Sequence, residues 1–184
     1  MNLCKYYFAM TVLLLSTQSA VAADRLWDLL REGGKVLLMR HLPVGPADPL
    51  LRDSSCRNEA NLSEEGKILG KSIAKMFLDQ NIPVGEVLAS PYCRTRDSAN
   101  LVFGKVKISK ILMLRPVLDE SQAEENDQVL LKIITTYQGQ DNLVLVTHRP
   151  NIEAVSFETL GKGAFAVLLP MGDNEFEELG VISP

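Results

Sequence analysis

The sequence predicts an α/β domain, a three-layer α/β/α sandwich with a mainly parallel central sheet. Two observations support this fold class. Short apolar runs, typical of buried strands, alternate with longer stretches of helical periodicity. Several of these runs are followed at once by a polar residue suited to chemistry, and in open α/β sheets ligands bind outside the carboxyl ends of the strands. No internal repeat or long linker is present, so we expect one domain with one pocket.

The beginning of the chain has the features of an export signal. Lys5 supplies a positive charge, residues 6–15 are apolar, and Ala20-Val21-Ala22 offers the small residues that a signal peptidase accepts. We therefore predict a signal peptide over 1–22, a domain over 23–184 and a periplasmic or otherwise exported location. An uncleaved membrane anchor is the alternative. A spanning helix needs about 20 apolar residues, and polar residues follow this run directly, so no stable span is expected after cleavage.

The charge balance argues against some classes of partner. The chain has 19 basic and 23 acidic residues, a net charge of −4. Loss of the signal removes Lys5 and no acid, which leaves 18 basic against 23 acidic residues. A net negative domain is not expected to bind nucleic acid or anionic membranes in general.

The first predicted elements lead to a histidine. Residues 35–40 form a short apolar run, typical of a buried strand, and the run ends at His41. Residues 42–61 are rich in Pro, Asp, Ser and Asn and predict a long loop, a feature that in compact domains tends to be functional or flexible. Ser63 is a good N-cap for a helix that ends before Pro83.

The same alternation continues to the end of the chain. The further predicted elements are a strand over 86–90, a helix over 94–103, a helix within 122–137, a strand over 142–147 and closing strands over 164–169 and 176–182. The strand over 142–147 stops at His148, just as the first strand stops at His41. The chain has only these two histidines, so their matching positions are its most informative feature.

Other common kinds of site have little support in the sequence. Zinc sites usually take three or four ligands, but the cysteines stand singly and there is no HExxH or CxxC string. The GxSxG turn of serine hydrolases and the phosphate-binding GxxxxGKS loop are both lacking from the sequence. We therefore expect no metal and no cofactor.

Three strings in order resemble the histidine phosphatase superfamily, which includes the phosphoglycerate mutase-like enzymes and small bacterial phosphatases. They are Arg40-His41, SPYCRTRDSA over 90–99 and VTHRPNI over 146–152. The string CRNEANLSEEG over 56–66, together with SPYCR, looks like the smaller exported bacterial branch, some of whose members act on phosphorylated sugars of the lipopolysaccharide core. The similarity runs from about Lys35 to Ile152.

The resemblance implies a role for each matched residue. His41 would take the phosphoryl group, since a neutral imidazole suits attack on a dianionic phosphate ester, and nearby positive groups help to keep it unprotonated. Arg40 and Arg94 would bind phosphate oxygens with their planar forks. His148, protonated when phosphate is bound, would be a further donor.

The match also has departures and open positions. Leu42 stands where the family has glycine, so we expect a differently shaped pocket floor. The family's acid sits in an LxE string, which makes Glu120 the predicted general acid and base and Asp119 its rival. Arg149 and Asn151 follow His148, but nothing in the sequence distinguishes contact with substrate from exposure to solvent.

Two cysteines remain after the signal is removed. Cys56 and Cys93 form an even pair in an exported chain, which makes them a disulfide candidate, with two separate buried thiols as the alternative. A bridge would pin the long loop beside the second motif.

The function predicted from these features is metal-independent hydrolysis of phosphomonoesters through a phosphohistidine on His41. The expected partner is a small phosphorylated substrate, a periplasmic sugar phosphate or a phosphate linked to lipopolysaccharide. The alternative is a phosphate-ester-binding module of the same fold without turnover, prompted by Leu42 and the uncertain acid.

Overall fold

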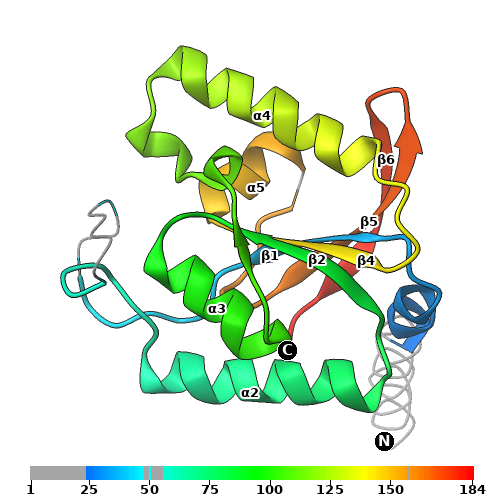
Figure 1. Cartoon of the computed structure of the whole chain (residues 1–184), viewed down its shortest axis with the longest axis horizontal. Coiled ribbons are helices and arrows are strands. Elements are labelled where there is room, and N and C mark those ends of the chain that lie inside the picture. Colours follow the sequence, from blue (N-terminus) through cyan, green and yellow to red (C-terminus); the bar gives the residue numbers. More distant parts are fainter. Residues whose placement is uncertain (1–23, 48–49, 51–55, 157) are drawn as a thin grey trace, which may run out of the picture.

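The computed structural model of the chain describes residues 24–47, 50, 56–156 and 158–184 (Figure 1). The predicted signal peptide lies outside the described residues, so its cleavage and the exported location remain predictions. Within the described ranges, no helix is both long and apolar enough to cross a membrane.

A six-stranded sheet forms the centre of the domain, in the order β3-β2-β4-β1-β5-β6. The strands are β1 (Val36–Arg40), β2 (Val84–Ala89), β3 (Lys107–Ile108), β4 (Asn142–Thr147), β5 (Phe165–Gly172) and β6 (Glu175–Ile182). Strands β1, β2, β3 and β4 pair parallel with one another. Strand β5 pairs antiparallel with both β1 and β6. The predicted mainly parallel sheet is confirmed.

Helices cover both faces of the sheet, which completes the predicted three layers. In Figure 1, α2 (Glu64–Asp79) and α3 (Cys93–Phe103) lie below the sheet, and α4 (Glu120–Thr135) and α5 (Arg149–Val155) lie above it. The short α5 and a helix over residues 24–31 are not among the elements predicted from sequence. The remaining helical turns are two 3-10 segments, Lys110–Leu112 and Arg115–Val117.

Side-chain caps fix where two of the helices begin. The Ser63 hydroxyl accepts the Gly66 N–H at 3.1 Å, which confirms the predicted start of α2. The α4 helix begins two residues before its predicted range. The reason is that the Asp119 carboxylate accepts the Gln122 N–H at 2.9 Å and so caps the helix.

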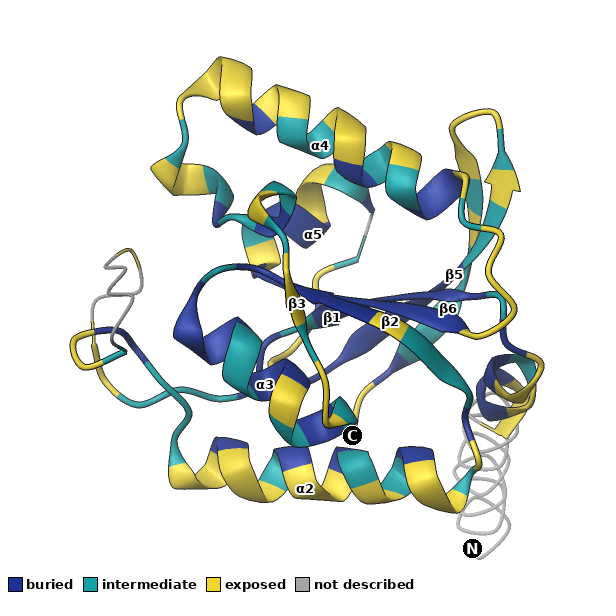
Figure 2. Cartoon of the chain, in the orientation of Figure 1, coloured by how far each residue is buried: buried dark blue, intermediate teal, exposed yellow. Residues whose placement is uncertain are grey.

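The two central strands, β1 and β4, are buried on both faces (Figure 2). Alternate residues of β1 join different core clusters. Leu37 and Met39 pack on the side of α2 and α3, and Leu38 packs on the side of α4. Burial of such a side chain contributes about 1.5–3 kcal/mol. Because neither face meets water, these strands have continuous apolar sequences.

The register of the strands brings the two histidines to one edge of the sheet. Arg40, the last residue of β1, lies beside Thr147, the last residue of β4. The His41 N–H continues this ladder by donating to the Thr147 carbonyl at 3.1 Å, and the Ser90 N–H donates to the Val146 carbonyl at 3.1 Å. The carboxyl ends of β1, β2 and β4 therefore meet at one place, as the fold class predicts.

Candidate active site

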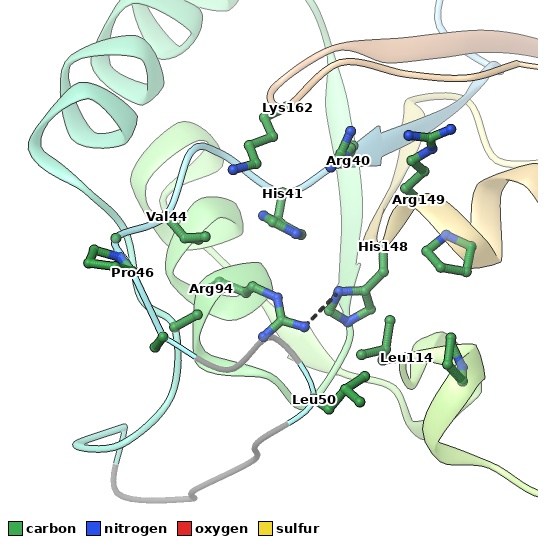
Figure 3. Close-up of a pocket in the computed structure, with 15 residues that line it drawn as sticks. Arg40, His41, Val44, Pro46, Leu50, Arg94, Leu114, His148, Arg149 and Lys162 are labelled. Atoms are coloured by element: carbon green, nitrogen blue, oxygen red, sulfur yellow. Dashed lines mark hydrogen bonds between the residues drawn. The ribbon is translucent and has the colours of Figure 1, made fainter.

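The rings of His41 and His148 lie next to each other, with centroids 5.6 Å apart. Both side chains are buried, and both line a pocket of about 520 Å³ (Figure 3). The other lining residues are Arg40, Val44, Gly45, Pro46, Ala47, Leu50, Ala60, Arg94, Leu114, Pro116, Arg149, Pro150 and Lys162. The four residues predicted to hold and accept the phosphoryl group, His41, His148, Arg40 and Arg94, thus share one pocket.

A backbone carbonyl fixes the tautomer of His41. Its Nδ1 lies 2.8 Å from the Leu42 carbonyl oxygen. Because a carbonyl only accepts, Nδ1 carries the proton and Nε2 keeps a free electron pair. Burial lowers the pKa of His41 to about 3, outweighing the opposite effect of this hydrogen bond. The positive charges of Arg94, Arg40 and Lys162 lower the pKa further, so the ring is neutral and nucleophilic at neutral pH.

His148 is held by Ser90 and Arg94. The Arg94 Nη2 lies 3.4 Å from Nδ1 of His148, and the Ser90 hydroxyl lies 2.9 Å from Nε2. A guanidinium only donates, so Nδ1 accepts and the Nε2–H donates to Ser90. Burial, followed by the charge of Arg94, lowers the pKa of His148 well below its ordinary value. The ring is neutral in this geometry, and the predicted protonated form belongs to a complex with a bound anion, whose charge raises the pKa.

Arg94 is buried in the first turn of α3 and lies over an aromatic ring. Its Cζ is 4.2 Å from the centroid of Tyr92, and that ring is 5.1 Å from the ring of His148. Burial lowers the pKa of Arg94, and the nearby Tyr92 and Glu59 partly offset this effect. The Glu59 carboxylate also accepts the Cys93 N–H at 2.6 Å. Tyr92 thus lies against the guanidinium, and Glu59 holds the first turn of α3, roles that no spacing in the sequence revealed.

Arg40 reaches the pocket from the end of β1. Its Nη1 donates to the Leu160 carbonyl at 2.8 Å. Its Nε is buried and has no hydrogen-bond partner among the described residues. Burial and the positive charge of Arg149 lower the pKa of Arg40. A bound oxyanion would satisfy this donor, which is consistent with the predicted phosphate-binding role.

Leu42, which stands where the resembled motif has glycine, lies beneath the pocket and does not line it. Its side chain is fully buried and is absent from the described lining. It packs beneath the site, so close to Gly70 that a Cβ added there would lie 2.7 Å from a Leu42 methyl group. The Leu42 N–H donates to the Ser98 hydroxyl at 3.0 Å. The larger residue thus fills the core below the nucleophile.

Glu120, the predicted acid, lies outside the pocket. It is the exposed first residue of α4, and the charged group it influences is Arg115. Its rival Asp119 is used as the cap of α4. Among the described residues that line the pocket there is no carboxylate. This placement gives no support to the role assigned to Glu120, whose LxE string resembles the family's by sequence alone.

The remaining predictions concern the cysteines and metal ligands. Cys56 and Cys93 are joined by a disulfide, with Cα atoms 5.7 Å apart, which confirms the predicted pairing. The bridge attaches the loop, at Cys56, to the residue before Arg94. In the part of the chain that the structure describes, no three His, Cys, Asp or Glu side chains are grouped as a metal site.

Solved structures share this fold, although a scan of protein-family models and a search of curated proteins gave no match. The protein histidine phosphatase SixA, solved with tungstate, aligns with a TM-score of 0.60 at 17% identity over 81% of this chain and 96% of its own. The alpha-ribazole phosphatase of Shigella flexneri aligns with a TM-score of 0.58 at 13% identity over 78% and 94%. A mycobacterial glucosyl-3-phosphoglycerate phosphatase gives 0.53 at 12% over 74% and 90%. The predicted phosphoglycerate mutase-like fold is therefore confirmed.

Proposed function

We propose that the protein is a phosphatase that hydrolyses phosphomonoesters through a phosphohistidine on His41, without a metal. The observation that carries this proposal is the pairing of a neutral His41 ring, 5.6 Å from His148, with the half-buried guanidinium group of Arg40 and the buried one of Arg94. This arrangement provides one nucleophile and several donors around the space for one phosphoryl group.

The geometry supports a two-step reaction. Nε2 of His41 attacks phosphorus as the bond to the leaving oxygen breaks, and water then attacks the phosphohistidine and releases phosphate. Charge spreads over the equatorial phosphoryl oxygens during each transfer. Arg40, Arg94 and His148 lie where they can stabilise that charge, and a fixed donor of this kind is typically worth about 3 kcal/mol.

The proposed substrate is a periplasmic sugar phosphate or a phosphate linked to lipopolysaccharide. The export-signal features of residues 1–22 and the resemblance to the exported branch support this choice. A structural neighbour is named a glucosyl-3-phosphoglycerate phosphatase, which supports a sugar-containing phosphate ester as the substrate.

A p-nitrophenyl phosphate assay in EDTA tests the proposal. We expect the purified domain to release nitrophenol in EDTA and His41→Ala to abolish that release. His41→Gln also removes the imidazole but leaves a longer side chain than alanine, so it controls for the loss of side-chain volume. Tight vanadate binding without turnover of any ester would instead identify the binding module, and activity lost in EDTA but restored by zinc would identify a metal enzyme.

Phosphohistidine on another protein is a second candidate substrate. The described lining offers no carboxylate to protonate a leaving alkoxide. Imidazole is a much better leaving group than an alkoxide, because it is a far weaker base. The neighbour SixA is itself named a protein histidine phosphatase. Faster turnover of a phosphohistidine peptide than of any sugar phosphate would favour this candidate.

A further inference from the structure

The part of the pocket away from Arg40 is apolar. Apart from the two histidines and the cationic residues, every described lining residue is apolar or glycine. Leu50 and Leu114 are the largest of these apolar residues. Figure 3 shows their side chains on the side of His148 away from Arg40. The pocket therefore offers an apolar surface beside the groups proposed to bind phosphate.

Leu114 is held in place by Asn151, a residue whose role the sequence left open. The buried Asn151 side chain accepts the Arg115 N–H at 3.2 Å and donates to the Met113 carbonyl at 2.6 Å. It thus bonds to both neighbours of Leu114 in the chain. Asn151 lies in α5, three residues after His148. The position of Leu114 is therefore linked to the strand end that carries His148.

Leu50 belongs to the loop and is held by Tyr92. The Tyr92 hydroxyl donates to the Leu50 carbonyl at 3.0 Å, and the ring of Tyr92 lies against Arg94 and His148. The Leu50 side chain is 51% exposed although it lines a pocket. An apolar group bound against it would remove both surfaces from water, which is favourable.

This lining suits a hydrocarbon group better than a free sugar. No described lining side chain carries a carboxylate, amide or hydroxyl group, the acceptors that would pair with the hydroxyl protons of a sugar. A sugar hydroxyl buried without a partner costs free energy. A methylene buried against leucine instead contributes favourable free energy.

We infer that Leu50 and Leu114 bind a hydrocarbon group of the substrate, so that the preferred phosphate ester carries an alkyl or acyl chain close to its scissile phosphate. The inference rests on the proposed phosphatase function and narrows its substrate class, since it favours an amphiphilic phosphate ester over a free sugar phosphate. The phosphoryl group lies among the arginines and histidines while the chain packs against the two leucines.

Alkylphosphonates of increasing chain length test this subsite, because a phosphatase does not hydrolyse their P–C bond. Calorimetry with methyl-, butyl- and hexylphosphonate gives Kd values for one anionic group with different chains. We expect hexylphosphonate to bind at least about tenfold more tightly than methylphosphonate, since each fully buried methylene is worth about fourfold. Leu50→Asn and Leu114→Asn should each reduce that ratio to about threefold or less. Leu78→Asn, the same substitution at an exposed position of α2, should leave the ratio unchanged.

The Leu50→Asn variant decides the test if Leu114→Asn does not fold, because Leu50 is exposed and contributes little to the core. Equal Kd values along the series, or a preference for long chains that survives Leu50→Asn, would overturn the subsite.

Turnover separates this inference from the proposed function. Hydrolysis of p-nitrophenyl phosphate without any chain-length preference would overturn the subsite alone. A chain-length preference in a protein that hydrolyses no ester would overturn the phosphatase proposal alone.

Discussion

The pocket has two walls that are built in different ways. The sheet-edge wall consists of His41, Arg94 and His148, which are buried and extend from strand ends and the first turn of α3. The loop wall consists of residues 44–47 and Leu50, is largely apolar, and has Leu50 51% exposed. The groups proposed for the chemistry thus sit on rigid elements, as precise positioning requires, whereas the loop wall is available to the rest of the proposed substrate.

Removal of a sheet-edge donor should give the largest effect. We expect Arg94→Ala to lower kcat/KM for p-nitrophenyl phosphate by about 10²–10³, because one fixed donor to the transferring group is lost. Arg94→Lys should restore little, since lysine lacks the planar fork. Thermal unfolding of both variants serves as the control for folding. Activity within threefold of the original protein would show that Arg94 is structural.

Removal of the disulfide tests how far the loop wall depends on its covalent attachment to α3. The bridge joins residues 37 positions apart, and such a cross-link typically contributes about 2–4 kcal/mol. We expect the double variant Cys56→Ser/Cys93→Ser to melt about 5–15 °C lower. Its kcat on p-nitrophenyl phosphate should fall far less than that of Arg94→Ala. A loss of kcat in the double cysteine variant as large as that in Arg94→Ala would contradict the division between the two walls.

A fall in pH should destabilise the folded protein, because the sheet-edge wall holds two buried, neutral histidines. The pKa of His41 is about 3 in the folded protein and ~6.5 in an unfolded chain. Between these values the unfolded state binds the extra proton, so stability falls as the pH drops below about 6.5, by at most about 1.4 kcal/mol per pH unit. The lowered pKa of His148 acts in the same direction.

Denaturant unfolding at pH 7.5 and 5.5 measures this effect. We expect the loss of stability between the two values to be smaller in His41→Gln than in the original protein, by about 1.4 kcal/mol. Identical pH dependence in the two proteins would show that His41 takes up its proton readily in the folded state.

The smallest effect is expected at Glu120, outside both walls. Because this side chain is exposed on α4 and does not line the pocket, Glu120→Gln should change kcat/KM less than twofold. The neighbouring substitution Glu124→Gln, also on an exposed part of α4, is a matched control. A loss of tenfold or more confined to Glu120→Gln would restore the acid role predicted from sequence.

The sequence predicted those parts that depend on local patterns. Continuous apolar runs identified β1 and β4, and the cap at Ser63 located the start of α2, because burial and capping leave direct marks on neighbouring residues. Two histidines after strand ends were enough to predict a shared site, since parallel strands end at the same edge of a sheet.

Other features depend on contacts between distant segments. The positions of Tyr92, Glu59 and Lys162 follow from how α3 and the turn before β5 pack against the end of β1, and no spacing encodes that packing. The role of Glu120 stays a prediction. Its LxE string resembles the motif of the histidine phosphatase superfamily, whereas in the structure Asp119 caps α4 and Glu120 is exposed.

The proposed mechanism requires the neutral Nε2 of His41 to receive the phosphoryl group. The most direct test mixes the protein with a phosphate ester, stops the reaction rapidly without acid, and identifies the phosphorylated residue by peptide mass spectrometry. We expect a phosphoryl group on His41 that forms within the first turnover, survives alkali and is lost in acid, and that does not form in His41→Gln. Phosphate release with no phosphorylated His41, or with the group on another side chain, would contradict it.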